Sequence, residues 1–307
     1  MTVTQKSMST VAWALLLFLA SIWGGSFVFA KIAVAEIPPF TLVLLRVSLA
    51  AATLWLVCLA TGVVMPRTLE AWRNYLVMGL LNNVIAFSLI FSGQIHIGAS
   101  LASILNAATP FFTVLIAGLL LADERFTTQK AAGIALGFVG VVLVIGPRHL
   151  IGLGEHLLSE LMLIGAAISY AFASVWGRRF AGENPMATAT GQLTMSTMMM
   201  IPVASIIDRP WALPMPSLTT ISSVLALAIV CTAFAYVLFF RILKMAGATN
   251  VSLVTMLVPV SATLIAVPLL GERLEFLTII GFAVISLGLM VLDGRPVKAA
   301  RRVFQKA

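Results

Sequence analysis

The sequence predicts an all-α polytopic membrane protein with ten transmembrane helices. Of its 307 residues, 61% are hydrophobic and 10% are charged, whereas about 25% are charged in a typical soluble domain. A soluble fold of this size could not bury so much apolar surface, so the surroundings must be lipid. Lipid offers the backbone no hydrogen-bond partners, and the ~10-residue alternating segments of a membrane β-barrel are not visible.

Ten apolar runs follow one another, each near the ~20 residues that cross the hydrocarbon core as a helix. They cover residues 11–35, 38–60, 74–93, 98–121, 128–146, 157–177, 186–207, 217–240, 247–270 and 275–292. The first run is too long for the apolar part of a signal peptide, and no A-x-A cleavage site follows it. Cys58 and Cys231 each lie alone in an apolar run, so no disulfide or metal site is predicted, and no cofactor is expected.

The cations predict the orientation of the chain. The formal charge of +8 does not indicate nucleic-acid binding, because the cations fall mostly in short gaps between apolar runs. Cytoplasmic loops of membrane proteins are rich in Lys and Arg. Segments on the side of the N-terminus hold fourteen of the nineteen: Lys6, Arg67, Arg73, Arg125, Lys130, Arg178, Arg179, Arg241, Lys244, Arg295, Lys298, Arg301, Arg302 and Lys306. Loops on the other side hold Arg148, Arg209 and Arg273. Both termini are therefore predicted to be cytoplasmic, with residues 293–307 as a basic tail at the anionic inner leaflet.

The chain repeats itself when it is shifted by about 148 residues. The shift places WGGSFVFAK on AFASVWGRR, so that Lys31 meets Arg179, and it places GIALGFVGVVLVIG on GFAVISLGLMVLDG. Between these stretches the shift pairs Pro110 with Pro259 and, after one gap, Glu124-Arg125 with Glu272-Arg273.

Each repeat contains five crossings, at residues 11–146 and 157–292. Five is odd, so the second copy must enter the membrane from the opposite side. Inverted repeats of this kind are typical of secondary transporters, whose substrate site lies near the membrane midplane where the halves meet. The inversion also explains why Arg273 is predicted outside while its mate Arg125 is predicted inside.

Several of these stretches resemble a known family. WGGSFVFAK with the following LLRVSLA is similar to the opening of an EamA-type member of the drug/metabolite transporter superfamily. The run AFAYVLFFRILKMAGATNVSLVTMLVPVSATLIAVPLLGERL, followed by IIGFAVISLGLMVL, resembles the second half of that family more closely. The resemblance implies two inverted five-helix repeats in the bacterial inner membrane. It also implies movement, usually export, of small metabolites such as amino acids.

Two cations interrupt apolar stretches near the turn at Pro38-Pro39. Lys31 and Arg46 either reach the membrane surface and bond helix-end carbonyls or Glu36, or they face a cavity and attract a carboxylate or phosphate. Arg46 is the stronger candidate, because a guanidinium binds a carboxylate through two hydrogen bonds. It matches the arginine of the family's second helix, and Gln192 stands in its place in the second repeat.

Other polar and aromatic residues are candidates for substrate contact or for helix packing. They are Trp23, Asn82, Asn83, Asn106, Tyr170, Tyr236 and Thr255. Adjacent asparagines point about 100° apart on a helix, so at most one of Asn82 and Asn83 faces a given cavity. Pro110 and Pro259 are expected to kink their helices, which suits either a gate or a fixed bend.

Three further expectations follow. Glycines at 133, 140, 146, 281, 288 and 294 fit close helix packing, either between the halves or between two copies of the chain as a homodimer.

Two alternative functions stay open. Gly24-Gly25-Ser26 with His96 as a base fits an intramembrane hydrolase, and the other alternative is a non-transporting membrane protein. No carboxylate is expected near the midplane, so proton coupling, exchange and facilitated diffusion all stay open.

Overall fold

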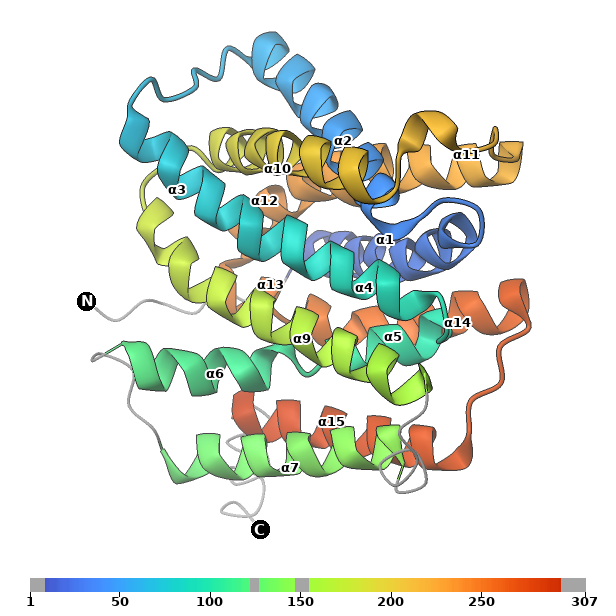
Figure 1. The fold of residues 1–307 in the computed structure, drawn as a ribbon. Helices are drawn as coiled ribbons and strands as arrows, with labels where there is room; N and C mark the ends of the chain where they lie inside the picture. Colours follow the sequence, from blue (N-terminus) through green and yellow to red (C-terminus); the bar gives the residue numbers. More distant parts are fainter. Residues whose placement is uncertain (1–8, 122–126, 147–154, 294–307) are drawn as a thin grey trace.

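The computed structural model describes residues 9–121, 127–146 and 155–293, and within these ranges the chain is built of helices joined by short turns (Figure 1). The first half contains α1 (Thr10–Val34), α2 (Pro39–Thr61), α3 (Leu69–Gly79), η1 (Leu80–Ile85), α4 (Ala86–Gln94), α5 (Ala99–Asn106), α6 (Thr109–Leu120) and α7 (Thr128–Ile145). The second contains α9 (Glu155–Trp176), η2 (Gly177–Phe180), α10 (Pro185–Ile207), η3 (Pro210–Ala212), α11 (Leu218–Leu225), η4 (Ala226–Phe234), α12 (Ala235–Ala246), α13 (Ala248–Val251), α14 (Val254–Leu270) and α15 (Phe276–Asp293).

These elements form the ten predicted crossings. In the described residues, nine helical stretches are long and apolar enough to span a membrane, and α14 is a shorter apolar helix. The eighth crossing continues to Ala246, beyond the predicted end at 240, and the added residues include Arg241 and Lys244. The fourth crossing is interrupted between Asn106 and Thr109. The protein is therefore a multi-pass membrane protein.

The two prolines predicted to kink helices act differently. Pro110 lies in the first turn of α6, where a missing backbone N–H leaves no hydrogen bond unmade. Pro259 lies inside α14, where it removes one bond of the helical ladder. The fourth crossing thus breaks into two helices before its proline, whereas α14 runs through its own.

The helix starts support the pairing of the two halves. Both α2 and α10 begin with a proline and run for 23 residues. Proline favours the first helical position because its fixed φ suits the helix. Arg46 and Gln192 each follow the initial proline by seven residues, at Pro39 and Pro185, so they occupy equivalent positions.

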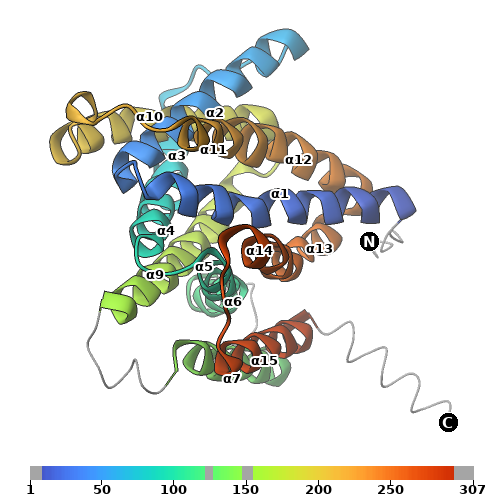
Figure 2. The same cartoon turned by 90° about the vertical axis from the view of Figure 1, so that its right-hand side faces the viewer.

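The helices pack as two inverted five-helix repeats. Helices α2 and α10 lie against each other, α1 packs on α14 as α9 packs on α6, and α7 lies along α15. The α2–α10 and α7–α15 contacts each join two repeat mates, and the repeat relates the α1–α14 contact to the α9–α6 contact. Figures 1 and 2 show the α7–α15 pair at one edge of the bundle.

Small residues bring α7 and α15 together. A Cβ atom on Gly140 would lie 2.9 Å from the carbonyl oxygen of Gly281, and one on Gly281 would lie 2.8 Å from that of Gly140. Both distances are shorter than real contacts allow, so these helices approach only because the side chains are absent. The predicted close packing is thus made between the two halves at Gly133, Gly140, Gly281 and Gly288, whereas a Cβ atom on Gly146 would meet nothing within 4 Å.

Several predictions concern segments outside the described residues. They include Glu124 and Arg125, Arg148, Gly294 and the basic tail after Asp293. The opposite placement of Arg125 and Arg273 therefore stays a prediction. The segment that follows α14, which contains Arg273, lies at the end of the molecule that carries the α1–α2 turn (Figure 1).

Candidate functional site

Arg46 is buried in the middle of the bundle. Its side chain is 7% exposed, and its Nε donates a 3.0 Å hydrogen bond to Oγ1 of Thr232. The guanidinium carbon lies 3.9 Å from the ring centroid of Phe87 and 5.7 Å from that of Phe91. A cation over an aromatic face is attracted by the negative charge of the ring. Helices α2, α4 and η4 together fix this side chain.

The charge of Arg46 has no neutralising partner in the part of the chain that the structure describes. Among the described residues no carboxylate forms an ion pair with it, and no side chain or carbonyl accepts from its terminal Nη groups. Burying a charge without a partner is costly. The fork of two Nη groups is the part of arginine that binds a carboxylate or phosphate through parallel hydrogen bonds.

Thr232 holds Arg46 through an irregular helical segment. It lies in η4, a π-helical stretch, and its hydroxyl donates to the carbonyl of Leu227 five residues earlier over 2.8 Å. The π-helical segment η1 occupies the corresponding place in the first repeat. Wide turns of this kind occur often at functional sites. No sequence pattern predicts such turns, so nothing in the sequence marks Thr232 as a candidate.

A second polar group centres on Tyr236 of α12. Its hydroxyl oxygen accepts from Nδ2 of Asn82 at 3.1 Å and from Nε2 of Gln192 at 3.3 Å. Gln192 is 4% exposed, and its Oε1 is buried without a hydrogen-bond partner. An orphan buried acceptor costs free energy unless a donor reaches it. Gln192 thus presents an acceptor where its repeat mate Arg46 presents donors.

These two groups lie together. Both Tyr170 of α9 and Tyr236 lie within electrostatic range of Arg46. The Arg46 cluster is defined here as Arg46, Asn82, Tyr170, Gln192, Thr232 and Tyr236. Its members come from both repeats, as the expectation of a site between the halves requires. Apart from Thr232, all were sequence candidates.

Asn83 points elsewhere. It is fully buried, and its Nδ2 donates to Oγ of Ser196 at 2.9 Å, while that hydroxyl donates to the carbonyl of Gln192 at 2.7 Å. These bonds join η1 to α10. Of the two adjacent asparagines, Asn82 therefore belongs to the group around Tyr236, and Asn83 contributes to helix packing.

The remaining polar candidates contact other groups. Asn106 ends α5 and has a buried Oδ1 without a partner. Thr255, at the start of α14, donates to the carbonyl of Ser252 at 2.8 Å. Trp23 of α1 packs against Phe239, with 5.7 Å between the ring centroids. Neither Thr255 nor Trp23 has a hydrogen bond to the Arg46 cluster in the described structure.

Lys31 contacts a helix end. Its ammonium donates to the carbonyl oxygens of Gln94 at 2.7 Å and Ile95 at 3.1 Å. These are among the last carbonyls of α4, which a helix leaves without internal partners. Lys31 and Arg46 therefore contact different groups, although the sequence places them at similar distances from the turn at Pro38-Pro39.

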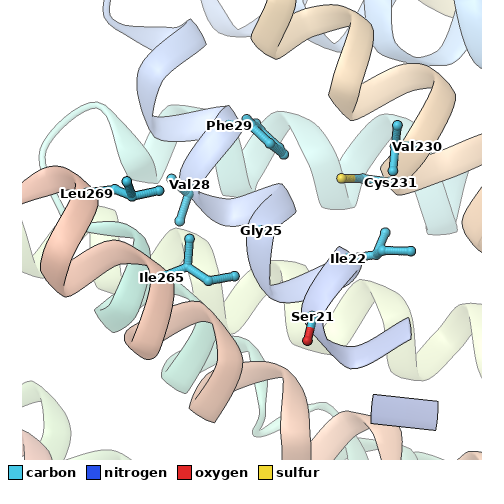
Figure 3. Close-up of a pocket in the computed structure, with 9 residues that line it drawn as sticks. All are labelled: Ser21, Ile22, Gly25, Val28, Phe29, Val230, Cys231, Ile265 and Leu269. Carbon is cyan, nitrogen blue, oxygen red and sulfur yellow. The ribbon is translucent and has the colours of Figure 1, made fainter. Parts of the chain in front are cut away.

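An apolar pocket of about 250 Å³ opens between α1, η4 and α14 (Figure 3). It is lined by Ser21, Ile22, Gly25, Val28, Phe29, Val230, Cys231, Ile265 and Leu269. Cys231 precedes Thr232 in the chain and lies within electrostatic range of Arg46. The pocket thus lies beside the polar cluster.

The residues of the hydrolase alternative have other contacts. The hydroxyl of Ser26 donates to the carbonyl of Trp23 in its own helix at 2.7 Å. His96 is exposed in the turn after α4, whereas Ser26 is buried inside α1.

Comparison with known proteins places this architecture in a family. The model of the EamA-like transporter family matches the chain twice, at residues 11–146 and 157–292. A "Probable amino-acid metabolite efflux pump" of Escherichia coli K12 is 30% identical over 294 residues, covering 92% of this chain and 95% of the relative. An "Uncharacterized transporter" of Archaeoglobus fulgidus is 29% identical over 279 residues, covering 89% of this chain and 94% of the relative.

A crystal structure with 22% sequence identity has the same fold. It superimposes with a TM-score of 0.66, and the match covers 93% of this chain and 98% of the other. With both repeats matched by one family model, the chain belongs to the EamA-like transporter family of the drug/metabolite transporter type.

Proposed function

We propose that the protein is a secondary transporter that exports amino acids or related small amphipathic metabolites across the bacterial inner membrane. Transport would proceed by alternating access at a midplane cavity between the inverted repeats, with both termini in the cytoplasm. The observation that carries this proposal is Arg46, a buried cation whose Nη groups have no partner in the described residues. Two relatives that are named as probable amino-acid metabolite efflux pumps support it.

Arg46 would bind the carboxylate of the substrate. Thr232 holds its Nε and Phe87 lies against its flat face, so the Nη fork is oriented before the substrate arrives. Preorganisation of this kind lowers the entropy lost on binding. A carboxylate would also neutralise the buried charge.

Gln192 would bind the ammonium group of the same substrate. Its Oε1 is buried and without a partner, and an ammonium is a strong donor that carries no acceptor. The bonds from Asn82 and Gln192 to Tyr236 would hold this acceptor in place. The apolar pocket beside Cys231 supports a substrate with a hydrophobic side chain.

Uptake of a labelled amino-acid panel into inside-out vesicles tests the proposal. Arg46→Gln, which copies the second repeat, is expected to reduce uptake of carboxylate substrates at least about tenfold, because a charged hydrogen-bond pair is lost. Arg241→Gln, which removes an exposed arginine of α12, is the matched control and should transport like the parent. Parent-like uptake by Arg46→Gln would refute the role of Arg46 in binding the carboxylate.

A second pair of variants separates the two ends of the substrate. Gln192→Leu is expected to lose uptake of amino acids and to keep uptake of their N-acetyl derivatives, which have no ammonium group. Gln129→Leu is the control, because Nε2 of Gln129 bonds the carbonyl of Val291 at 2.8 Å, between α7 and α15. Equal losses for both substrates in Gln192→Leu would refute the ammonium contact.

The hydrolase alternative makes the opposite prediction. Ser26→Ala should keep full transport if the protein is a carrier. Proteolysis by the purified parent without uptake, lost in Ser26→Ala, would favour the enzyme.

A further inference from the structure

The turn between α4 and α5, residues 95–98, is held by two side chains of opposite charge. Lys31 of α1 donates to the carbonyls of Gln94 and Ile95 at the end of α4. Glu272, which follows α14, accepts from the backbone amides of Ala99 at 2.5 Å and Ser100 at 3.0 Å, at the start of α5.

Each charge has the sign that its helix end favours. The last carbonyls of a helix carry partial negative charge and its first amides partial positive charge, and both sets lack partners within the helix. A cation on the end of α4 and an anion on the start of α5 therefore satisfy both ends. Lys31 and Glu272 also attract each other electrostatically. We call Lys31 and Glu272 the charge latch.

The charge latch joins two groups of helices that also meet through α5. Helix α1 packs chiefly on α14 and on the α11–η4–α12 crossing, α4 and α6 pack chiefly on α9, and α5 packs on both α14 and α9. Gln94 adds a fifth hydrogen bond between the groups, from its Nε2 to the carbonyl of Phe27 at 2.9 Å. Gly98 makes room for the carboxylate, since a Cβ atom there would lie 2.6 Å from Oε1 of Glu272.

The repeat places a corresponding cation at the opposite face of the molecule. In the described structure this cation is not bonded to a helix end as Lys31 is. The repeat mate of Lys31 is Arg179, whose guanidinium carbon lies 4.2 Å from the ring centroid of Trp176. Arg179 lines a groove of about 400 Å³ with Leu120, Leu121, Val175, Trp176 and Arg178. In the described structure it makes no hydrogen bond to the end of α12, the repeat mate of α4.

We propose that the charge latch closes the transport path at the face that carries the α1–α2 turn, and that Arg179 is the cation of a corresponding latch at the opposite face. The two engage alternately, and the conformation described here has the first closed and the second open. Lys31 is then a gating residue. This inference rests on the proposed alternating access.

Distances between paired spin labels test the charge latch without requiring transport. Labels at Ile95 and Leu269, which are 46% and 69% exposed, are placed across the first face in liposomes, with Cys58 and Cys231 replaced by serine. Lys31→Met is expected to raise the ratio of long to short distances about tenfold, because charged hydrogen bonds hold the closed state. Arg273→Gln, beside Glu272, is the control and should leave the distribution unchanged.

Two further variants keep the test decisive. Gly98→Ala retains both charges and should lengthen the same distances by pushing Glu272 away. Labels at Ala181 and Met245 report on the opposite face, where Lys31→Met should shorten the distance. Adding Arg179→Met to Lys31→Met should reverse part of that shortening, since the opposite closed state loses its cation.

Unchanged distances in both Lys31→Met and Gly98→Ala, in protein that melts like the parent, would overturn the inference. Failure of the proposed function looks different. If the parent carries no amino acid but Lys31→Met and Gly98→Ala still lengthen the label distances, the proposed function is refuted and the charge latch is not. Normal amino-acid transport with unchanged distances would refute the charge latch alone.

Discussion

Nε of Arg46 and Oγ1 of Thr232 lie 3.0 Å apart and join α2 to the π-helical segment η4 of the other repeat. Among the described residues, the Nη groups of the arginine have no hydrogen-bond partner. Because Thr232 also donates to Leu227, its hydroxyl is held in place by its own helix. This geometry makes Thr232 a positioning residue for Arg46.

Thr232→Val keeps the shape of the side chain and removes the acceptor. We expect KM for carboxylate substrates to rise about tenfold with little change in kcat, because a bond of about 1.4 kcal/mol orients the guanidinium before substrate binds. Concentration-dependent uptake into liposomes measures both constants. Thr197→Val is the control, since that hydroxyl bonds Leu193 within its own helix. Equal KM values in the two variants would contradict the prediction.

Adjacent glycines in α1 should respond differently to alanine. A Cβ on Gly24 would clash with Oγ of Ser261 and lie 2.6 Å from the amide of Ala262, whereas one on Gly25 would meet nothing closer than 3.7 Å. Gly24→Ala is therefore expected to lower the free energy of unfolding by about 1–3 kcal/mol, because overpacking separates α1 from α14. Gly25→Ala should be neutral or stabilising by up to about 1 kcal/mol, since alanine favours the helix. Thermal melting in detergent compares them, and equal melting temperatures would refute the close approach.

Glu36 should make stability depend on pH. Hydrogen bonds from the backbone amide and hydroxyl of Ser217, at 2.6 and 2.7 Å, hold the pKa of Glu36 below its ordinary value of 4.5. A carboxylate with a lowered folded-state pKa stabilises the fold fully above its ordinary pKa, and this contribution is lost as the pH falls through the folded-state pKa.

As the pH falls below 4.5, the ordinary pKa of Glu36, the melting temperature of the parent should therefore drop more steeply than that of Glu36→Gln. Glu275→Gln, which removes another exposed carboxylate, should follow the parent. Parallel curves for the parent and Glu36→Gln would show that the bond to Ser217 does not contribute.

The orientation in the membrane can be tested at two exposed positions. Met215 is 89% exposed just before α11, and Leu69 is 86% exposed at the start of α3. Each precedes or begins its crossing, and the two starts lie at opposite ends of the molecule (Figure 1). A membrane-impermeant thiol reagent added to intact cells should label Met215→Cys and not Leu69→Cys, because the N-terminus is predicted to be cytoplasmic. The native Cys58 and Cys231 are buried and give little background. The reverse pattern would invert the predicted topology.

Much of the fold follows from local properties of the sequence. Long apolar runs predict crossings because the backbone must satisfy itself in lipid. The prolines at 39 and 185 mark equivalent helix starts, and the repeat predicts inverted halves. The predicted end of the eighth crossing was less accurate, because the apolar run stops at 240 whereas the helix includes Arg241 and Lys244 and continues to Ala246.

The candidate site could be predicted only in part. Arg46, Gln192 and Tyr236 stand out because polar groups within an apolar run must find partners. Thr232 and Glu272 do not, because a threonine or a loop carboxylate is ordinary in sequence. Thr232 is 186 positions from Arg46 along the chain, and only packing of the halves brings them together.

The sequence by itself determined that this chain lies in lipid, crosses it ten times and is duplicated, since composition, run length and periodicity are local quantities. The tertiary structure alone decided that Lys31 holds a helix end while Arg46 is buried in the bundle. Contacts between distant helices depend on which faces of the helices pack together. A wide π-helical turn or a glycine without a Cβ atom alters which side chains touch, and the composition of the sequence does not reveal this change.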